Sequence, residues 1–333
     1  MRKLAKVVKV DDLIPMENAA FIEIAKVEGW QCVIKKGTFA IGQLAVYVEI
    51  DSWVPNSIAP FLSKDKEPKE YNGVKGEKLR TVKLRGSLSQ GLLLPFSILP
   101  NTNYNIGDDV TEILGIQKWE ASIPAQLQGM AKGLFPSFIP KTDQERIQNL
   151  SDELNDWVTK GLTFEVTEKL DGSSMTVYLF NDDEGVCSRN IDLKETEDNT
   201  FWKVCRREKL LDKISGLNIA IQGELIGEGI QGNPYKLKGQ DFYLFDIYDI
   251  TKGQYYSPQE RIEFCTSHNI KHVPILDVKK NITRYTIDDI LDFAESKSTL
   301  NANTEREGVV FKCNEDSSIH FKSISNKFLL GER

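Results

Sequence analysis

The stretch Phe164–Met175, FEVTEKLDGSSM, joins an apolar, strand-like run to a lysine and an Asp-Gly turn. Lys169 ends the run, and Asp171 and Gly172 follow it closely. A lysine can act as a nucleophile only after it loses its proton, because its reference pKa is about 10.4. Nearby cations or burial would favour the neutral amine. Gly172 permits a tight turn, and Asp171 can hold a reacting group.

The same pattern also describes an ordinary hairpin with a solvated lysine, so the rest of the chain has to decide between the two. At 333 residues the chain is long enough for two domains with separate cores. No apolar run approaches the roughly 20 residues of a membrane helix, and the first residues lack the apolar segment of a secretion signal. We therefore expect a cytoplasmic protein with no membrane partner.

Cysteine and histidine are too scarce and too scattered to suggest a zinc site. The five cysteines form no C-x-x-C pair, and the chain has only three histidines. We expect the cysteines to be reduced core residues. Any metal should be a hard ion, Mg²⁺ or Mn²⁺, bound by carboxylates, water and phosphate.

The charge of the chain is unevenly distributed. The net charge is −7, but residues 1–115 carry 15 basic against 14 acidic residues, and residues 116–333 carry 27 against 35. A nucleic-acid partner would therefore need a local basic track, because no domain is basic as a whole.

Residues 1–115 contain short β-rich runs separated by Gly, Pro, Asn and Asp, including KLAKVVKV, AFIEIAKV, QCVIKK and LAVYVEI. This spacing predicts a small antiparallel barrel of the OB type, with nucleic-acid binding as its role. Glu28-Gly29 indicates one of its hairpin turns. Lys83 and Arg85 would share one face of a strand, either as part of an RNA-binding track or as a solvated strand edge.

Residues 116–160 are predicted to form a structured connector with a helix. Thr142 and Glu145 have the spacing of a capping box, which predicts a helix from there to about Val158. Lys141 and Arg146 are candidates for contact with an RNA phosphate, although either charge could belong to a solvated helix face.

Residues 161–333 alternate strand-like and helix-like segments, which predicts an α+β domain with mainly antiparallel sheets and flanking helices. The strand candidates are FEVTEKL, MTVYLF, IAIQGELIG, DFYLFDIYD, GVVFK and HFKSIS. Helices are expected within residues 200–214, after Ser257 and after Thr286, the last two residues being suitable N-caps.

Further short motifs follow the lysine in a fixed order. They are CSRN with Arg189, IQGELIG with Glu224, DFYLFDI with Phe245 and Asp246, REGVVFK with Glu307 and Lys312, and HFKSISNKF with Lys322 and Lys327. In this order the motifs resemble those of the covalent nucleotidyltransferases, specifically the ATP-dependent RNA ligases, over about residues 140–328. The resemblance implies an ATP-grasp-like ligase domain. The segments KLRGSLSQGLLLP and FPSFIPKTDQERIQNL extend it to the RNA ligases whose OB domain precedes the nucleotidyltransferase domain.

The resemblance also implies a chemistry. Lys169 would attack the α-phosphorus of ATP, expel pyrophosphate and hold AMP as a phosphoramidate, with Mg²⁺ or Mn²⁺ and Lys322 neutralising the developing charge. The implied catalytic residues are Lys169, Asp171, Glu307 and Lys322. The implied ATP-binding residues are Lys169, Arg189, Glu224, Phe245, Lys312 and Lys322, with Phe245 as the base-stacking ring. The implied metal ligands are Glu307, Glu224 and Asp246, and Lys327 is a further candidate for RNA contact.

Several of these residues have plainer alternatives when each is taken alone. Glu224 faces opposite to Leu225 on its strand and could be a surface glutamate, and Lys312 and Lys327 could be solvated. Asp246 is harder to explain in this way, because a carboxylate inside so apolar a strand needs a partner.

At two positions the chain differs from some of the enzymes that it resembles. Ser174 stands where DNA ligases and capping enzymes have an arginine, and Ile324 stands where related nick-sealing ligases often have a second lysine. We hypothesise a monomeric ATP-dependent RNA ligase of RNA repair that joins 3′-hydroxyl and 5′-phosphate RNA ends, as at nicks in duplexes. The alternatives are a DNA ligase, a GTP-dependent capping enzyme, or an RNA-binding protein whose second domain is inactive.

Overall fold

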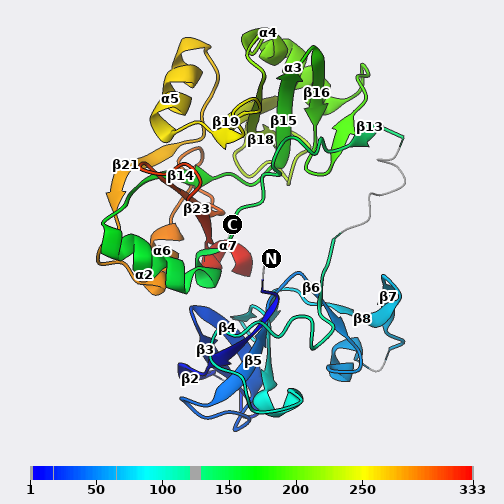
Figure 1. The fold of residues 1–333 in the computed structure, drawn as a ribbon, viewed down its shortest axis with the longest axis vertical. Helices are drawn as coiled ribbons and strands as arrows, with labels where there is room; N and C mark the ends of the chain where they lie inside the picture. Colours follow the sequence, from blue (N-terminus) through cyan, green and yellow to red (C-terminus); the bar gives the residue numbers. More distant parts are fainter. Residues whose placement is uncertain (1–2, 18, 65, 121–128, 332–333) are drawn as a thin grey trace. The chain divides into compact units, whose positions relative to one another are not determined.

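The computed structural model describes residues 3–17, 19–64, 66–120 and 129–331, and the chain divides into two compact units, Met1–Ser122 and Ile123–Arg333 (Figure 1). Residues 121–128 of the predicted connector lie outside the described residues, as do residues 1–2 and 332–333. The predicted domain limits at residues 115 and 160 stay predictions. In the described ranges, no helix has the length and apolar character needed to cross a membrane.

The first unit is built almost entirely from short antiparallel strands. They are β1 (Ala5–Lys9), β2 (Asp12–Pro15), β3 (Ile22–Val27), β4 (Trp30–Lys35), β5 (Leu44–Val48), β6 (Ser52–Pro55), β7 (Lys69–Tyr71), β8 (Val74–Lys78), β9 (Val82–Leu84), β10 (Ser87–Ser89), β11 (Leu92–Pro95) and β12 (Gln117–Lys118), with short 3₁₀ helices η1 (Pro60–Ser63) and η2 (Phe96–Ile98).

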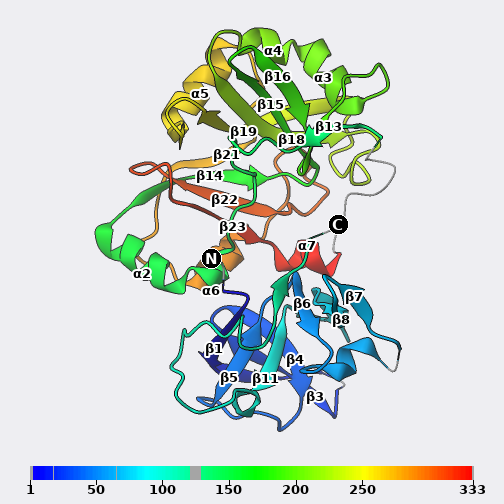
Figure 2. The ribbon, with the colours of Figure 1, turned by 45° about the vertical axis from the view of Figure 1, so that its right-hand side comes forward.

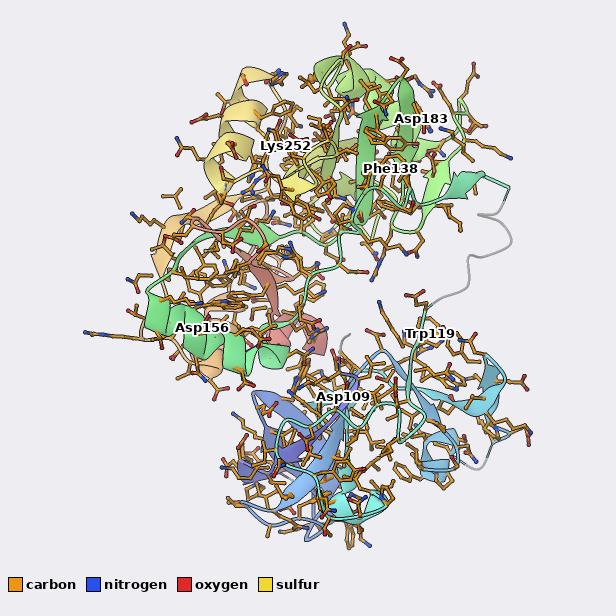
Figure 3. The ribbon with its side chains drawn as sticks, in the orientation of Figure 1. Asp109, Trp119, Phe138, Asp156, Asp183 and Lys252 are labelled. Atoms are coloured by element: carbon orange, nitrogen blue, oxygen red, sulfur yellow. The ribbon has the colours of Figure 1, made fainter. Side chains whose placement is uncertain are left out.

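Hydrogen bonds arrange these strands as four sheets, in the orders β1-β5-β11, β2-β3-β4, β9-β10 and β12-β6-β8-β7. Within the described ranges of this unit, no ladder closes the sheets into the barrel that the sequence predicts. The β3–β4 hairpin confirms the predicted Glu28-Gly29 turn, because both residues have positive φ and Val27 pairs with Trp30. Lys78 lies over the ring of Trp119, which Figure 3 labels, with Nζ 3.6 Å from the ring centroid.

The hairpin β9–β10 corrects one expectation about the basic residues. Lys83 lies on β9, but Arg85 lies in the two-residue turn with Gly86, at φ values of 47° and 87°. The two side chains therefore do not share a strand face. The sequence KLRGS was misread because glycine at the second turn position favours a tight hairpin that ends the strand at Leu84.

The second unit contains two antiparallel sheets and most of the helices. Its strands are β13 (Ala131–Leu134), β14 (Thr163–Lys169), β15 (Ser173–Phe180), β16 (Asp183–Cys187), β17 (Ile191–Leu193), β18 (Ile219–Gly227), β19 (Gln240–Asp249), β20 (Gln254–Tyr255), β21 (Ile275–Asn281), β22 (Gly308–Cys313) and β23 (His320–Ile324). Its helices are η3 (Ile147–Asn149), α2 (Ser151–Lys160), α3 (Thr200–Glu208), α4 (Leu210–Lys213), α5 (Pro258–Ser267), α6 (Ile287–Ala294) and α7 (Asn326–Leu330).

The two sheets lie one above the other, with helices on their outer faces (Figure 2). The larger sheet has the order β13-β17-β16-β15-β18-β19-β20, and the smaller has the order β21-β14-β22-β23. Apolar residues of the larger sheet pack against α3, α4 and α5. Those of the smaller sheet, such as Phe164 and Phe311, pack against α2 and α6. The opposite face of β14, which carries Lys169, is therefore turned away from the α2–α6 core.

Local sequence signals account for two of the helices. Ser257 and Thr286 each form a complete capping box, with Glu260 and Asp289 respectively, at the start of α5 and α6. Both N-cap predictions are thereby confirmed. The five cysteines are all free and buried, as expected of core residues.

The predicted capping box at Thr142 and Glu145 is wrong. Helix α2 begins only at Ser151, and the Thr142 hydroxyl lies 2.8 Å from that of Ser174 on β15. Glu145 instead accepts hydrogen bonds from the Arg146 backbone and the Asn149 side chain. The Thr142 hydroxyl is thus engaged in a tertiary contact with Ser174 and does not cap a helix.

The segment before α2 packs on the larger sheet. Phe138, labelled in Figure 3, lies edge-on to Tyr178 and tilted against Phe180, with ring centroids 5.7 and 5.0 Å apart. The Gln222 side chain donates a hydrogen bond to the Pro140 carbonyl at 2.8 Å. These contacts fix the residues that lead into the candidate site.

Candidate active site

The predicted nucleophile lies beside a predicted carboxylate. Lys169 ends β14 and pairs in register with Gly308, the first residue of β22, so that the preceding Glu307 lies next to it. The Lys169 Nζ is 2.7 Å from the Glu307 Oε2, and both side chains are largely buried. Residues 138 positions apart in the sequence are thus joined by the pairing of two adjacent strands.

A second carboxylate shares this environment. Glu224 lies on β18, where it pairs with Ser174 of β15. The pKa of Glu224 is raised to about 8, mainly by burial and also by the charges of Glu307 and Asp171, against the opposing effect of Lys169. Leu225 belongs to the core behind β18, as its alternation with Glu224 predicts.

The neighbouring carboxylates affect the pKa of Lys169 more strongly than its burial does. Burial lowers the pKa of Lys169, but the charges of Glu307, Glu224 and Asp171 leave it above its ordinary value. The expectation that the surroundings favour the neutral amine is therefore not met by the protein groups alone. Something that neutralises these carboxylates is needed before the lysine can attack.

Gly172 is required for a reason other than the predicted one. Its φ lies outside the left-handed region, so the turn does not depend on the conformational freedom of glycine. A Cβ at this position would instead lie 2.5 Å from the Leu225 carbonyl oxygen and 2.9 Å from Cγ of Glu224. The absence of a side chain lets the turn after Lys169 approach β18 closely.

Lys322 faces the same group of charges from β23. It pairs with Val310 of β22, and its backbone N–H donates to the Glu145 carbonyl at 2.8 Å. The pKa of Lys322 is lowered to about 8, mainly by burial and also by the positive charges of Lys169 and Arg146. Lys322 and Arg146 also form an isolated parallel bridge, which brings this predicted RNA contact to the site.

Arg189 and Lys141 meet near the turn between β16 and β17. The Arg189 guanidinium donates to Asp143 at 2.6 Å, and its side chain is 64% exposed. The Lys141 Nζ donates to the Asn190 side chain at 3.3 Å. Both basic side chains therefore remain accessible to a ligand that approaches from solvent.

Phe245 lies on β19 and packs against a small cluster that includes Leu170, which follows the nucleophile. The Lys312 Nζ donates to the Phe245 carbonyl and lies 2.5 Å from the Asp246 Oδ1. Burial lowers the pKa of Lys312 to about 8 despite the opposing charge of Asp246. Lys312 thus connects β22 to β19, the strand that carries the predicted stacking ring of Phe245. Lys312 is also the partner that we expected the Asp246 carboxylate to need in so apolar a strand.

A second buried ion pair joins the sheets farther from Lys169. Arg261 of α5 pairs with Glu165 of β14, and both side chains are 1% exposed. The Arg261 Nε donates to His272 Nε2 at 2.9 Å, and His272 Nδ1 lies 2.6 Å from the Val273 carbonyl. Burial and the charge of Arg261 lower the pKa of His272 to about 3.

The donor set fits a hard divalent cation. Glu224 and Glu307 supply carboxylate oxygens, and their mutual repulsion is what a cation would relieve. In residues 3–17, 19–64, 66–120 and 129–331, no three His, Cys, Asp or Glu side chains form a ready-made metal site. Phosphate and water oxygens would have to complete the coordination shell. The metal role predicted for Asp246 stays a prediction, and the ion pair with Lys312 argues against it.

The remaining predicted RNA contacts lie elsewhere. Lys327 is the second residue of the short helix α7 and pairs with Glu295 at 3.4 Å. Lys83 and Arg85 lie on the exposed β9–β10 hairpin of the first unit.

Sequence reasoning missed two residues that support the site. Tyr235, which is 5% exposed, accepts a hydrogen bond at 2.6 Å from the backbone N–H of Asp171. Arg261 forms the buried pair described above. Neither gave a recognisable signal, because Tyr235 follows Asn-Pro in what reads as a loop and Arg261 lies between the charged residues Glu260 and Glu263 of a predicted helix.

Two family models match the chain. A family model described as RNA ligase matches residues 162–328, and an OB-fold domain model matches residues 4–96. The OB-fold prediction is confirmed at the level of the fold. A search of curated proteins returned no match.

Solved structures of an RNA ligase from Naegleria gruberi resemble the whole chain at 49% identity. One, a Lys-to-Met mutant with AMP and Mn, has a TM-score of 0.84 and aligns over 100% of this chain and 99% of its own. Another, with PPi, has a TM-score of 0.83 and aligns over 100% of both chains. A third, a Glu-to-Ala mutant with ATP and Mn, has a TM-score of 0.82 over 100% of this chain and 99% of its own. At this identity and coverage, the chain belongs to the RNA ligase family.

Proposed function

We propose that this RNA ligase activates RNA 5′-phosphate ends through an AMP carried on Lys169. The observation that carries the proposal is the contact of Lys169 with Glu307, with Glu224 and Lys322 in the same electrostatic environment. A nucleophilic amine, two carboxylates and a further cation are what nucleotidyl transfer from a polyphosphate requires. The relatives that contain ATP or AMP with Mn support the choice of nucleotide and cation.

In the first step the neutral Lys169 Nζ attacks the α-phosphorus of ATP. A nitrogen–phosphorus bond forms, the bond to the β-phosphate oxygen breaks, and pyrophosphate leaves. Lys322 balances the charge on the α-phosphate oxygens, and Phe245 stacks on the adenine. Glu307 and Glu224 would hold Mg²⁺ or Mn²⁺, which would supply charge neutralisation and thereby lower the pKa of Lys169.

Two transfers to RNA complete the reaction. The 5′-phosphate of one RNA end attacks the phosphorus of the lysyl-AMP, so that AMP passes to the RNA and Lys169 is released. The 3′-hydroxyl of the other end then attacks the activated 5′-phosphate and expels AMP. Arg189 and Lys141, which are exposed, and the partly buried Arg146 are the proposed contacts of the 5′-phosphate, and Asp171 helps to hold the reacting groups. Nicks in duplex RNA are the proposed substrates.

We propose that the three segments predicted from the sequence have separate roles. Residues 1–115 would bind RNA through backbone and 2′-hydroxyl contacts, residues 116–160 would connect, and residues 161–333 would carry out adenylyl transfer on an ATP-grasp-like scaffold. Lys83, Arg85 and Lys327 are the proposed outer RNA contacts. We also propose a monomer inside the cell, where the free cysteines remain reduced.

The first test is covalent labelling with α-labelled ATP and Mg²⁺ or Mn²⁺, using protein stripped of bound AMP by pyrophosphate. Lys169→Ala should lose the label, whereas Lys160→Ala, a change in a surface ion pair of α2, should keep it. GTP in parallel distinguishes a capping-type activity. Absence of label in the wild-type protein contradicts the proposal, and sealing of a 3′-hydroxyl/5′-phosphate nick tests the later steps.

A further inference from the structure

The loop between β18 and β19 is strained and internally braced. In this loop, residues 228–239, Gln231, Asn233 and Lys236 all adopt left-handed φ values between 46° and 53°, which non-glycine residues rarely do. The Asn233 side chain spans the loop, because it both donates to the Leu237 carbonyl and accepts from the Leu237 N–H. Backbone strain of this kind persists where surrounding contacts hold it, commonly beside functional sites.

The loop contacts the turn after the nucleophile at two points. The Tyr235 hydroxyl oxygen accepts the Asp171 N–H at 2.6 Å, and the Gln231 side chain donates to the Gly172 carbonyl at 3.3 Å. Tyr235 packs with Leu170 in the same apolar cluster. Burial raises the pKa of Tyr235, so its hydroxyl stays neutral, and the oxygen of this neutral hydroxyl accepts the Asp171 N–H.

A second set of contacts reaches the other side of Lys169. The buried Glu168 carboxylate accepts the Thr299 N–H at 2.8 Å. Two residues later, the Asn301 side chain donates to the Pro234 carbonyl of the loop at 2.7 Å. Glu168 and Asp171, which flank the nucleophile, are therefore joined through residues 299–301 and the loop into one ring of hydrogen bonds.

We propose that Tyr235 is a positioning residue for adenylyl transfer. Its hydroxyl oxygen fixes the Asp171 backbone and thereby the position from which the Lys169 amine attacks. The proposal rests on the function proposed above. Without the hydroxyl, the half-buried Asp171 N–H has to find another partner, and the turn moves to reach it. A displacement of about 1 Å at a reacting group can slow a reaction on the order of 10²-fold.

The test compares Tyr235→Phe with Tyr178→Phe, measuring single-turnover labelling of Lys169 over a range of ATP concentrations. Both changes remove a buried hydroxyl from the second unit, because Tyr178 donates to Asp192 at 3.0 Å. We expect Tyr235→Phe to lower the saturating rate roughly 10- to 100-fold. Its half-saturating ATP concentration should stay within about twofold of wild type, because the nucleotide contacts are unchanged. Tyr178→Phe should keep the wild-type rate.

Wild-type labelling is established first, so that failure of the proposed function is recognised separately. The inference is overturned if Tyr235→Phe keeps the wild-type saturating rate, or if Tyr178→Phe is slowed equally. If Tyr235→Phe does not fold, Asn301→Asp decides, because it replaces the amide that donates to Pro234 by a carboxylate and keeps the oxygen that accepts the Asn303 N–H. A folded Asn301→Asp protein with a lowered saturating rate supports the ring of contacts, and one with the wild-type rate overturns it.

Discussion

Replacing Gly172 by alanine should affect both the geometry of the site and the stability of the fold, and the two effects can be measured separately. The new Cβ would lie 2.5 Å from the Leu225 carbonyl oxygen and 2.6 Å from Cγ2 of Ile226, whereas ordinary contacts begin at 3.4 Å. The turn and β18 must therefore separate by about 0.9 Å, the difference between these values. Overpacking of this size costs about 1–3 kcal/mol of folding free energy.

The same displacement moves Asp171 and Glu224 relative to Lys169. Because about 1 Å of misplacement can cost on the order of 10²-fold in rate, the labelling rate of the folded protein should fall by about that factor. A loss of about 1–3 kcal/mol leaves a protein of ordinary stability folded, so the two effects can be measured separately. Single-turnover labelling and urea unfolding measure the two effects. Gly133→Ala is the matched control, since a Cβ there has nothing within 4 Å. A Gly172→Ala protein with wild-type rate and wild-type stability would refute this account of the glycine.

Glu165→Ala leaves the charge of Arg261 buried without its partner, and urea unfolding should show a loss of about 3–5 kcal/mol; a loss below about 1 kcal/mol would contradict this. Because the pKa of His272 is lowered to about 3, the folded state resists a proton that the unfolded state accepts near pH 6.5. Stability is therefore lost as pH falls below 6.5, by about 2 kcal/mol from this residue between pH 7 and 5, and His272→Asn should lack this part of the slope. Phe245→Ala should raise the half-saturating ATP concentration roughly 5- to 150-fold, as loss of 1–3 kcal/mol of stacking predicts, while Phe180→Ala should not.

Local signals predicted the elements well where side chains act on their own backbone. The Glu28-Gly29 turn and the caps at Ser257 and Thr286 all depend on contacts within a few residues, and all are confirmed. The failure at Thr142 has the opposite cause. Its hydroxyl is close to Ser174, 32 positions away, and no local pattern contains that information.

The site was predictable only through the order of its motifs. No periodicity shows that Glu307 lies against Lys169, because their contact depends on the pairing of β14 with β22. The motif order suggested the partners, but not the balance of their charges. That balance raises the pKa of Lys169, although burial alone would lower it.

The residues that support the candidate site were its least predictable part. Lys312 was expected among the ATP contacts, yet its amine donates to the Phe245 carbonyl and to Asp246. Tyr235 lies in a stretch, GNPYK, whose turn-forming residues conceal a buried side chain. In both cases the partner lies more than 60 positions away in the sequence.

The place of Lys169 in the smaller sheet has a consequence for the timing of the catalytic cycle. β14 is hydrogen-bonded on both sides, to β21 and to β22, and is nearly all buried. Strands of this kind open last in hydrogen exchange, so the carrier of AMP would be among the least mobile parts of the chain. A cofactor on a swinging arm travels between its reaction partners. Here the activated nucleotide would stay still, and the pace of the later steps would be set by how quickly RNA ends arrive and leave.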